Sequence, residues 1–234
     1  MSATIKQWLL GLRDGETPLA HPRLSARYAS VLIGLVVLGG LVVPGGRLGI
    51  DMRWSELMRD AEASWWTHLA LAFNALGHGI LRGLTIAGVG LVLLIAGRRA
   101  ALLAFALAEA LTPLLVNLIK LLVGRERPPG AMIEAHGSSY PSGHAAYAGA
   151  TAVLLVLLFT SPGRRRRAGW AVAVVSTAAM VWSRTYLQVH WLSDAVAGAA
   201  LGVGVALLTV AAVQIVSTPP GHANGCAETG PRSR

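Results

Sequence analysis

The 234-residue sequence is poor in cysteine and in charged side chains, acidic ones above all. Cys226 is the single cysteine, so no disulfide can form within the chain. Charged residues make up 13% of the chain, about half the share of an ordinary soluble domain. Asp and Glu number 11 against 20 Lys and Arg, which gives a formal net charge of +9. This composition disfavours a soluble globular protein.

Long apolar runs take the place of the missing charge. Hydrophobic residues make up 54% of the chain, and a helix needs about 20 of them to cross a hydrocarbon core of about 30 Å. Six such runs lie at 28–44, 79–96, 101–123, 144–160, 169–186 and 195–216. The sequence predicts an all-α integral membrane bundle of six transmembrane helices. Buried helices of a large soluble protein are the alternative, but this chain has too little polar sequence to cover six of them.

The remaining segments flank or interrupt this bundle. Residues 1–27 show no pattern of a cleaved signal peptide and are predicted to be a cytoplasmic N-terminal segment, ahead of a membrane domain over 28–216. The tail 217–234 is rich in Gly, Pro, Thr, Asn and Ser, a composition typical of disorder. Residues 49–79 mix tryptophans and charges with apolar residues at helical spacing, which predicts an interfacial helix on the outer side.

The distribution of Lys and Arg predicts the orientation. With six spans, both termini share one side, and that side carries the whole formal excess of nine positive charges. Cytoplasmic loops hold such an excess, so both termini are predicted to be cytoplasmic in the inner (plasma) membrane. The basic run 163–167 then fits an anchor at anionic headgroups better than a nucleic-acid site. Arg82 and Glu109 fall within spans, where an unpaired charge is costly, and are predicted to pair.

Three polar clusters fall on the opposite, outer side. In "KLLVGRERPPG", Lys120 ends the third run and Arg127 stands in a turn fixed by two prolines; a snorkelling lysine and an ordinary loop arginine are the alternative. In "YPSGH", Ser142 can cap the next helix, Gly143 lets backbone approach a ligand, and His144 faces the resulting anion seat. A plain capping turn with an idle histidine is the alternative there.

The third cluster is "SRTYLQVHWLSD". His190 and Asp194 are four residues apart, so on a helix they would share a face, and the carboxylate would hold one ring nitrogen. Arg184 adds a guanidinium suited to phosphate. A metal site that recruits His136 and His144 is the alternative, although no further ligand lies close in sequence. Together the clusters supply three cations, a helix N-terminus and two histidines, an inventory that favours phosphoryl transfer.

The three clusters resemble the signature of the type 2 phosphatidic acid phosphatase superfamily, which includes membrane lipid phosphatases and soluble vanadium haloperoxidases. The signature is K-x6-RP, PSGH and SR-x5-H-x3-D, and every position matches between Lys120 and Asp194. The resemblance implies a helical bundle with its site at the outer leaflet, on the periplasmic or extracellular face, and no metal or other cofactor.

The resemblance also implies a role for each residue. His190 would attack phosphorus and form a phosphohistidine, with Asp194 holding its other nitrogen, and His144 would protonate the leaving oxygen. The phosphoryl oxygens would be bound by Lys120, Arg127, Arg184, Ser142 and the backbone of Gly143.

The implied partners are the bilayer and a lipid phosphate, with no nucleic acid; the sequence does not indicate an oligomeric state. A polyprenyl (undecaprenyl) diphosphate is the first substrate to test, and phosphatidylglycerol phosphate and phosphatidic acid are its rivals. The alternatives to a hydrolase are a lipid phosphotransferase and a noncatalytic membrane transporter.

Overall fold

The computed structural model describes residues 18–43 and 48–217, and this part of the chain forms eight helices. Their bounds are α2 Pro22–Val42, α3 Gly49–Asp60, α4 Ser64–Leu76, α5 Gly79–Ile95, α6 Arg99–Val123, α7 Gly143–Phe159, α8 Arg164–Tyr186 and α9 Leu192–Ser217. The expected all-α fold is confirmed. Cys226 and nearly all of the predicted disordered tail lie outside the described residues.

Each of the six predicted runs corresponds to a helix of the bundle, but two of these helices begin five or six residues earlier than predicted. The first, α2, begins at Pro22, because proline fits the first turn of a helix, where its missing N–H is not needed. The second, α8, begins at Arg164, since arginine is a good helix former. The four consecutive arginines therefore form the first turn of α8, ahead of the predicted run 169–186.

The helices differ in how well they suit a membrane. By length and composition, α2, α6 and α9 could each cross one, and α4 and α5 together make a fourth candidate that is bent by 50°. Large apolar side chains of α2 point outward, with Val31 and Leu35 each 60% exposed. Such a surface suits lipid and would be unusual in water. The number of six spans stays a prediction.

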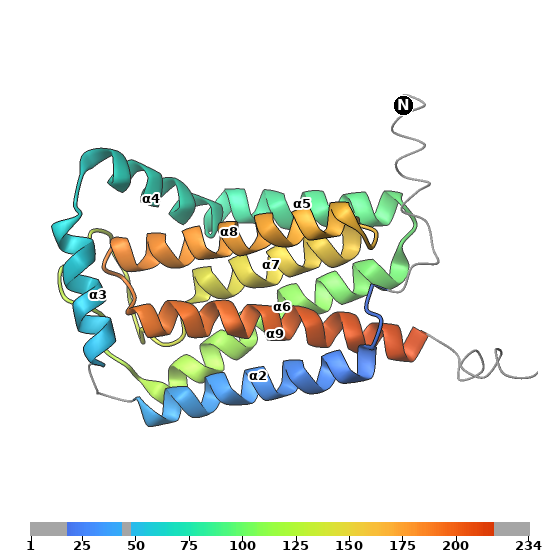
Figure 1. The fold of residues 1–234 in the computed structure, drawn as a ribbon, viewed down its shortest axis with the longest axis horizontal. Helices are drawn as coiled ribbons and strands as arrows, with labels where there is room; N and C mark the ends of the chain where they lie inside the picture. The colour runs from blue at the N-terminus through green and yellow to red at the C-terminus, as the bar shows by residue number, and fades with distance from the viewer. Residues whose placement is uncertain (1–17, 44–47, 218–234) are drawn as a thin grey trace, which may run out of the picture.

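The outer segment 49–79 forms two helices where one was predicted. In Figure 1, α3 runs across one end of the bundle, and α4 leads into α5 along its upper edge. The break between α4 and α5 falls at Gly77 and His78. Gly77 lies so close to α7 that a Cβ there would come within 2.5 Å of Cδ2 of His144. This contact ties the bend to the first turn of α7.

Close packing of α7 against α9 forms the centre of the bundle. A Cβ added at Gly202 would lie 1.9 Å from the carbonyl oxygen of Ala146, and one at Gly198 would lie 2.2 Å from that of Ser142. Small residues let helix backbones approach closely in this way, which is typical of membrane bundles. The contact holds the first turns of α7 and α9 side by side.

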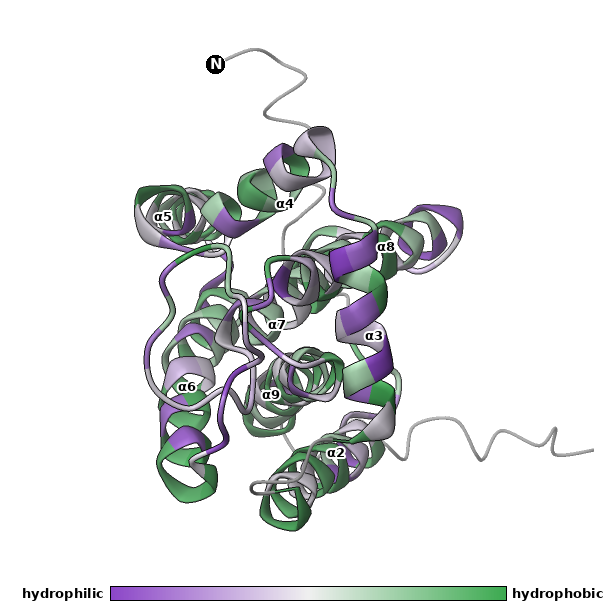
Figure 2. Ribbon diagram, turned by 90° about the vertical axis from the view of Figure 1, so that its left-hand side faces the viewer, coloured by the Kyte–Doolittle hydropathy of each residue, from purple (hydrophilic) through white to green (hydrophobic). Residues whose placement is uncertain are grey.

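The three polar clusters predicted to form the site all lie at the end of the bundle that α3 crosses. The chain after α6, the start of α7 and the connection from α8 to α9 all meet there (Figure 1). Figure 2 looks onto this end and shows the loops gathered between α3 and the ends of the helices. The arginine-rich turns before α6 and at the start of α8 lie at the opposite end.

Candidate active site

The end of α6 positions two cations. Lys120 lies in its last turn and donates a hydrogen bond from Nζ to the carbonyl of Ser138. Gly124 ends the helix in the left-handed conformation, with φ 63°, which glycine adopts without strain. The guanidinium of Arg127 donates to the carbonyls of Val189 at 2.6 Å, His136 at 2.9 Å and Gly137 at 3.1 Å. Arg127 is thereby fixed between the α6–α7 loop and the α8–α9 connection.

The start of α7 contributes Ser142, Gly143 and His144. Ser142 is the N-cap residue, and its backbone N–H donates to the carbonyl of Asp194 at 3.0 Å. The predicted side-chain cap is absent: in the described part of the chain, the buried Ser142 hydroxyl has no hydrogen-bond partner. Contact of the Ser142 backbone with Gly198 of α9 fixes this residue. The first N–H groups of α7 therefore have no side-chain cap and face whatever ligand the site holds.

Arg184 lies in the last turn of α8, with only 1% of its surface exposed. One terminal nitrogen donates to Oδ1 of Asn74 on α4 at 2.7 Å. Its Nε and other terminal nitrogen have no partner among the described residues. Burying guanidinium N–H groups without acceptors is unfavourable, so this geometry favours an anion as the missing partner.

His190 lies in the turn between α8 and α9, so the prediction that His190 and Asp194 share a helix is wrong. Helix α8 ends at Tyr186, Gln188 takes a left-handed conformation with φ 53°, and α9 begins only at Leu192. The turn still brings the pair together, with Nδ1 of His190 3.9 Å from Oδ2 of Asp194. This separation is longer than a hydrogen bond.

The two ring nitrogens of His190 face different surroundings. Nδ1 lies 3.5 Å from the hydroxyl of Ser139 and faces the Asp194 carboxylate, while Nε2 lies 3.4 Å from Arg127. A proton on Nδ1 matches these acceptors and leaves a lone pair on Nε2. Nε2 is therefore the nitrogen positioned to act as a nucleophile.

Burial lowers the pKa of His190 well below its usual value of 6.5, and the neighbouring charges of Arg127, Lys120, Arg184 and His144 lower it further. The imidazole is thus neutral near pH 7, the state that a nucleophile requires. The same interactions place all of these groups within electrostatic range of one ring. The sequence motifs therefore form a single cluster in space.

A buried charge network that the sequence did not predict supports this cluster. Arg125 forms ion pairs with Asp194 and, at 2.7 Å, with Asp51 of α3. Asp51 also accepts hydrogen bonds from the backbone N–H of Ser193, at 2.8 Å, and from its hydroxyl. Arg125 lies inside the K-x6-RP interval, but nothing in the sequence links it to a carboxylate 74 residues earlier.

Two further polar side chains escaped the sequence-based prediction. Ser139 donates a hydrogen bond from its hydroxyl to Asp194, and Asn74 orients Arg184. No cluster of three or more His, Cys, Asp and Glu side chains suited to a metal occurs in residues 18–43 and 48–217. His136, the extra ligand considered from the sequence, offers its backbone carbonyl to Arg127.

A family model described as the PAP2 superfamily matches residues 101–217, half of the chain. The chain belongs to the PAP2 superfamily. This match confirms the resemblance that the three motifs indicated, and all eight predicted site residues lie within it.

One curated relative is an undecaprenyl-diphosphatase of Sulfolobus acidocaldarius, 40% identical over 82 residues. That alignment covers 35% of this chain and 35% of the relative, so the chain matches about a third of the relative's length.

Two solved structures resemble the fold. A transmembrane PAP2-type phosphatidylglycerolphosphate phosphatase from Bacillus subtilis has a TM-score of 0.64 and 20% identity, and covers 82% of this chain and 94% of its own. LpxE of Aquifex aeolicus has a TM-score of 0.58 and 22% identity, with 69% of this chain and 95% of its own covered. At such low identity these likenesses establish the fold.

Unpaired buried polar atoms mark the centre of this candidate site. In the described part of the chain, five buried side-chain polar atoms lack a hydrogen-bond partner. Four of them belong to the motif residues: the Ser142 hydroxyl, Nε2 of His144, and Nε and one terminal nitrogen of Arg184. Buried polar groups are nearly always paired, so a cluster of unpaired ones indicates a missing ligand with several acceptor oxygens. A phosphoryl group fits this description.

Proposed function

We propose that this PAP2 protein is a membrane lipid phosphate phosphatase that acts through a phosphohistidine on His190. The observation that carries the proposal is the set of unpaired buried polar atoms on Ser142, His144 and Arg184. His144 and Arg184 lie within electrostatic range of His190. Catalysis of phosphoryl transfer depends chiefly on positioning and on neutralising the equatorial oxygens, and cations with fixed N–H groups supply both.

In the proposed reaction, Nε2 of His190 attacks the phosphorus of the bound phosphate. The bond from phosphorus to the leaving oxygen breaks, and His144 gives that oxygen a proton. Water then attacks the phosphohistidine, His144 takes up the proton of the water, and the electron pair of the P–N bond returns to Nε2. Lys120, Arg127 and Arg184 neutralise the three equatorial oxygens, aided by Ser142 and the N–H of Gly143.

Asp194 is held in place beside His190 by neighbouring hydrogen-bond donors. Its carboxylate accepts hydrogen bonds from Ser139, from the backbone N–H of Trp191 at 2.9 Å and from Arg125. The carboxylate is held firmly beside His190, and it stabilises the positive charge that the ring gains when Nε2 bonds to phosphorus.

The proposed substrate is undecaprenyl diphosphate or another polyprenyl diphosphate. The name of the Sulfolobus relative supports this choice, because the aligned segments are 40% identical. Phosphatidylglycerol phosphate and phosphatidic acid are the comparison substrates. The lipid would reach the site from the bilayer, in line with the apolar outer surface of the bundle.

The proposed orientation places the site on the periplasmic or extracellular face of the inner (plasma) membrane. The arginines at the opposite end of the bundle support this orientation, because cytoplasmic ends of membrane helices carry the excess of basic residues. Both chain termini would then be cytoplasmic.

Purified protein in detergent tests the proposal. It is incubated with undecaprenyl diphosphate, phosphatidylglycerol phosphate and phosphatidic acid in the presence of EDTA, and free phosphate is measured. Release of phosphate that is absent in His190→Ala supports a metal-independent phosphatase. No release from any of the three lipids contradicts the proposal, and transfer of the phosphoryl group to an added acceptor alcohol without release of free phosphate would identify a phosphotransferase instead.

A further inference from the structure

The fifth unpaired buried polar atom lies outside the three PAP2 motifs. It is Nε of Arg82, on the first turn of α5. The terminal nitrogen NH2 of Arg82 lies 3.4 Å from Oε2 of Glu109 on α6, so the predicted pairing is confirmed, with both side chains partly exposed. This distance exceeds the 2.7 to 2.9 Å usual for a charge-assisted hydrogen bond. The guanidinium also lies over the ring of Tyr147, 3.3 Å from its centre.

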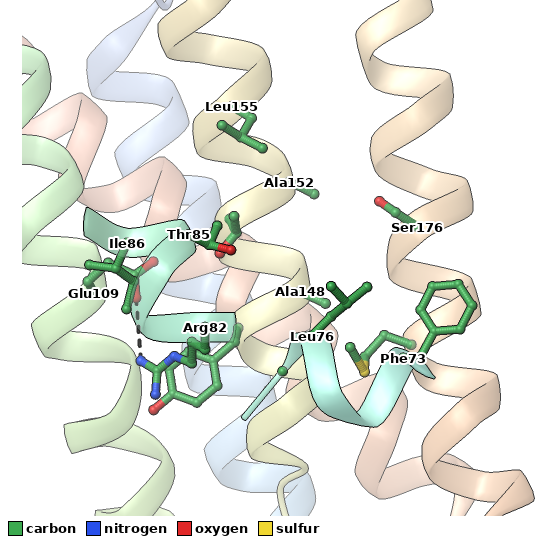
Figure 3. A pocket seen from close by; sticks show the side chains of 14 residues that line it. Phe73, Leu76, Arg82, Thr85, Ile86, Glu109, Ala148, Ala152, Leu155 and Ser176 are labelled. Carbon is green, nitrogen blue, oxygen red and sulfur yellow. Dashed lines mark hydrogen bonds and ion pairs between the residues drawn. The ribbon is translucent and has the colours of Figure 1, made fainter. Parts of the chain in front are cut away.

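Arg82 lines a pocket of about 240 Å³ between α4, α5, α6, α7 and α8. Figure 3 shows Arg82 and Glu109 joined on one side of this pocket and Leu76, Phe73 and Leu155 on the others. The walls are otherwise mainly apolar, and Arg82 and Glu109 are the only charged residues among them. A charge that lines an apolar cavity in a membrane protein is expensive and calls for a function.

The pocket lies close to His144, although His144 does not line it. Gly77, which packs directly on the His144 ring, is one of the lining residues, and Met180 is another. Along α7, Tyr147 follows His144 by about 4.5 Å and Thr151 by about 10.5 Å, at 1.5 Å per residue. The pocket therefore lies next to the proposed general acid, and along α7 it is lined by residues from Tyr147 to Leu155.

The in-line geometry of phosphoryl transfer predicts which part of the substrate would lie in this pocket. The attacking and leaving atoms stand on opposite sides of phosphorus, so the leaving oxygen lies on the side of His144, away from His190. In a lipid diphosphate this bridging oxygen carries a second phosphate, which remains attached to the lipid. In a lipid monophosphate it carries carbon.

We propose that Arg82 binds the lipid-linked phosphate of a diphosphate substrate and makes the site selective for lipid diphosphates over monophosphates. His190 forms a bond to the distal phosphorus, the bond to the bridging oxygen breaks, and that oxygen leaves on the lipid monophosphate with the proton of His144. Arg82 neutralises the phosphate on which the leaving charge develops. The lipid chain extends along the apolar walls beyond it. This inference rests on the proposed phosphatase function.

Glu109 has a complementary part. It compensates the charge of Arg82 while the pocket holds no anion, and its 3.4 Å contact leaves Nε of Arg82 available. An arriving phosphate supplies acceptor oxygens that this single contact does not. Glu109 thus holds the guanidinium of Arg82 in place and leaves its Nε donor unpaired.

The test compares farnesyl diphosphate with farnesyl monophosphate, which share one tail, by the kcat/KM for phosphate release. In the double variant Arg82→Gln/Glu109→Gln, which leaves neither charge alone, the preference for diphosphate is expected to fall about tenfold or more. Arg82→Lys keeps the charge but not the planar fork and should keep part of the preference. Glu109→Gln, with Arg82 intact, should keep it or raise it.

Binding of methylenediphosphonate, which is not hydrolysed, gives a readout that does not depend on turnover. Relative to the wild-type protein, the double variant should lose a larger factor in affinity for methylenediphosphonate than for inorganic phosphate. An unchanged preference for diphosphate in a folded double variant would overturn the role of Arg82 and leave the proposed phosphatase function standing. Equal losses of kcat/KM for both substrates and of affinity for both ligands would do the same. Absence of hydrolysis of either substrate by the wild-type protein would overturn the proposed function itself.

Discussion

Arg125 and Asp194 form an ion pair in which both side chains are almost fully buried, 2% and 0% exposed. The pair joins the loop after α6 to the first turn of α9, beside His190. Arg125 also binds Asp51, which is itself fully buried on α3. One guanidinium thus holds together the end of the bundle on which the proposed site is built.

Loss of this guanidinium is expected to destabilise the protein strongly. Arg125→Met leaves the carboxylates of Asp51 and Asp194 buried without their cation, and breaking a buried pair in this way costs about 3 to 5 kcal/mol. Chemical unfolding in detergent measures the change. Arg125→Lys keeps the charge and should lose less.

Arg53→Met is the matched control, because Arg53 is an exposed arginine of the same helix as Asp51. Its free energy of unfolding should lie within about 0.5 kcal/mol of that of the wild-type protein. Equal stability of Arg125→Met and Arg53→Met would show that the buried network contributes little.

His190 is expected to carry the phosphoryl group during turnover. Brief incubation with substrate labelled with ³²P at the distal phosphate, followed by an alkaline quench, should leave label on the wild-type protein that acid removes. His190→Ala should show neither label nor turnover. His68→Ala is the control, since His68 is exposed on α4 and bonds to the carbonyl of Ser64 in its own helix. Label on the His190→Ala protein would assign the nucleophile to another residue.

Arg184 is expected to act mainly on the transition state. Two of its nitrogens lack partners among the residues that the structure describes. Loss of one fixed donor to a developing anion typically lowers kcat about 10²- to 10³-fold. Arg184→Ala should therefore lower kcat at least this much, and Arg184→Lys should recover only part of the loss, because lysine lacks the planar fork. Steady-state kinetics separates kcat from KM; a change confined to KM would contradict this role.

The depressed pKa of His190 predicts how stability depends on pH. In the unfolded chain this imidazole titrates near pH 6.5, whereas in the folded chain its pKa is well below this value because of burial and of Arg127. Below pH 6.5 the unfolded state takes up a proton that the folded state does not. The contribution of His190 is thus complete above pH 6.5 and is lost as the pH falls, by at most about 1.4 kcal/mol per pH unit.

Unfolding free energies of the wild-type protein and His190→Gln at pH 7.5, 6.5 and 5.5 measure this dependence, because the other histidines cancel in the difference. The wild-type protein should lose more stability on acidification. Parallel curves for the two proteins would mean that His190 titrates alike in the folded and unfolded states.

The motif residues were predictable from the sequence because their spacing is local, whereas their supports were not. Lys120 and Arg127, or Arg184 and His190, lie within seven residues of each other. Asp51 and Asn74 reach the site from the segment before α5, and Asn74 meets Arg184 across 110 positions of sequence. Such contacts depend on how α3 and α4 pack, and no periodicity in the sequence encodes that.

The turn that carries His190 was missed for a related reason. A spacing of four residues between His190 and Asp194 suits a helix, but the left-handed Gln188 belongs to the turn that separates α8 from α9. The long apolar runs, in contrast, were placed within a few residues, since burial in lipid requires continuous hydrophobic sequence.

The proposed orientation can be tested by chemical labelling from outside the cell. In a Cys226→Ser background, Glu134→Cys places one thiol on the exposed loop at the site end of the bundle, and Arg165→Cys places one on the exposed first turn of α8 at the other end. A membrane-impermeant maleimide added to intact cells or spheroplasts should label the thiol at position 134, because the arginine-rich end is expected on the cytoplasmic side. The thiol at position 165 should react only after the membrane is opened with detergent. Labelling in the reverse pattern would place the site in the cytoplasm, and its lipid phosphate would then have to be presented from the inner leaflet.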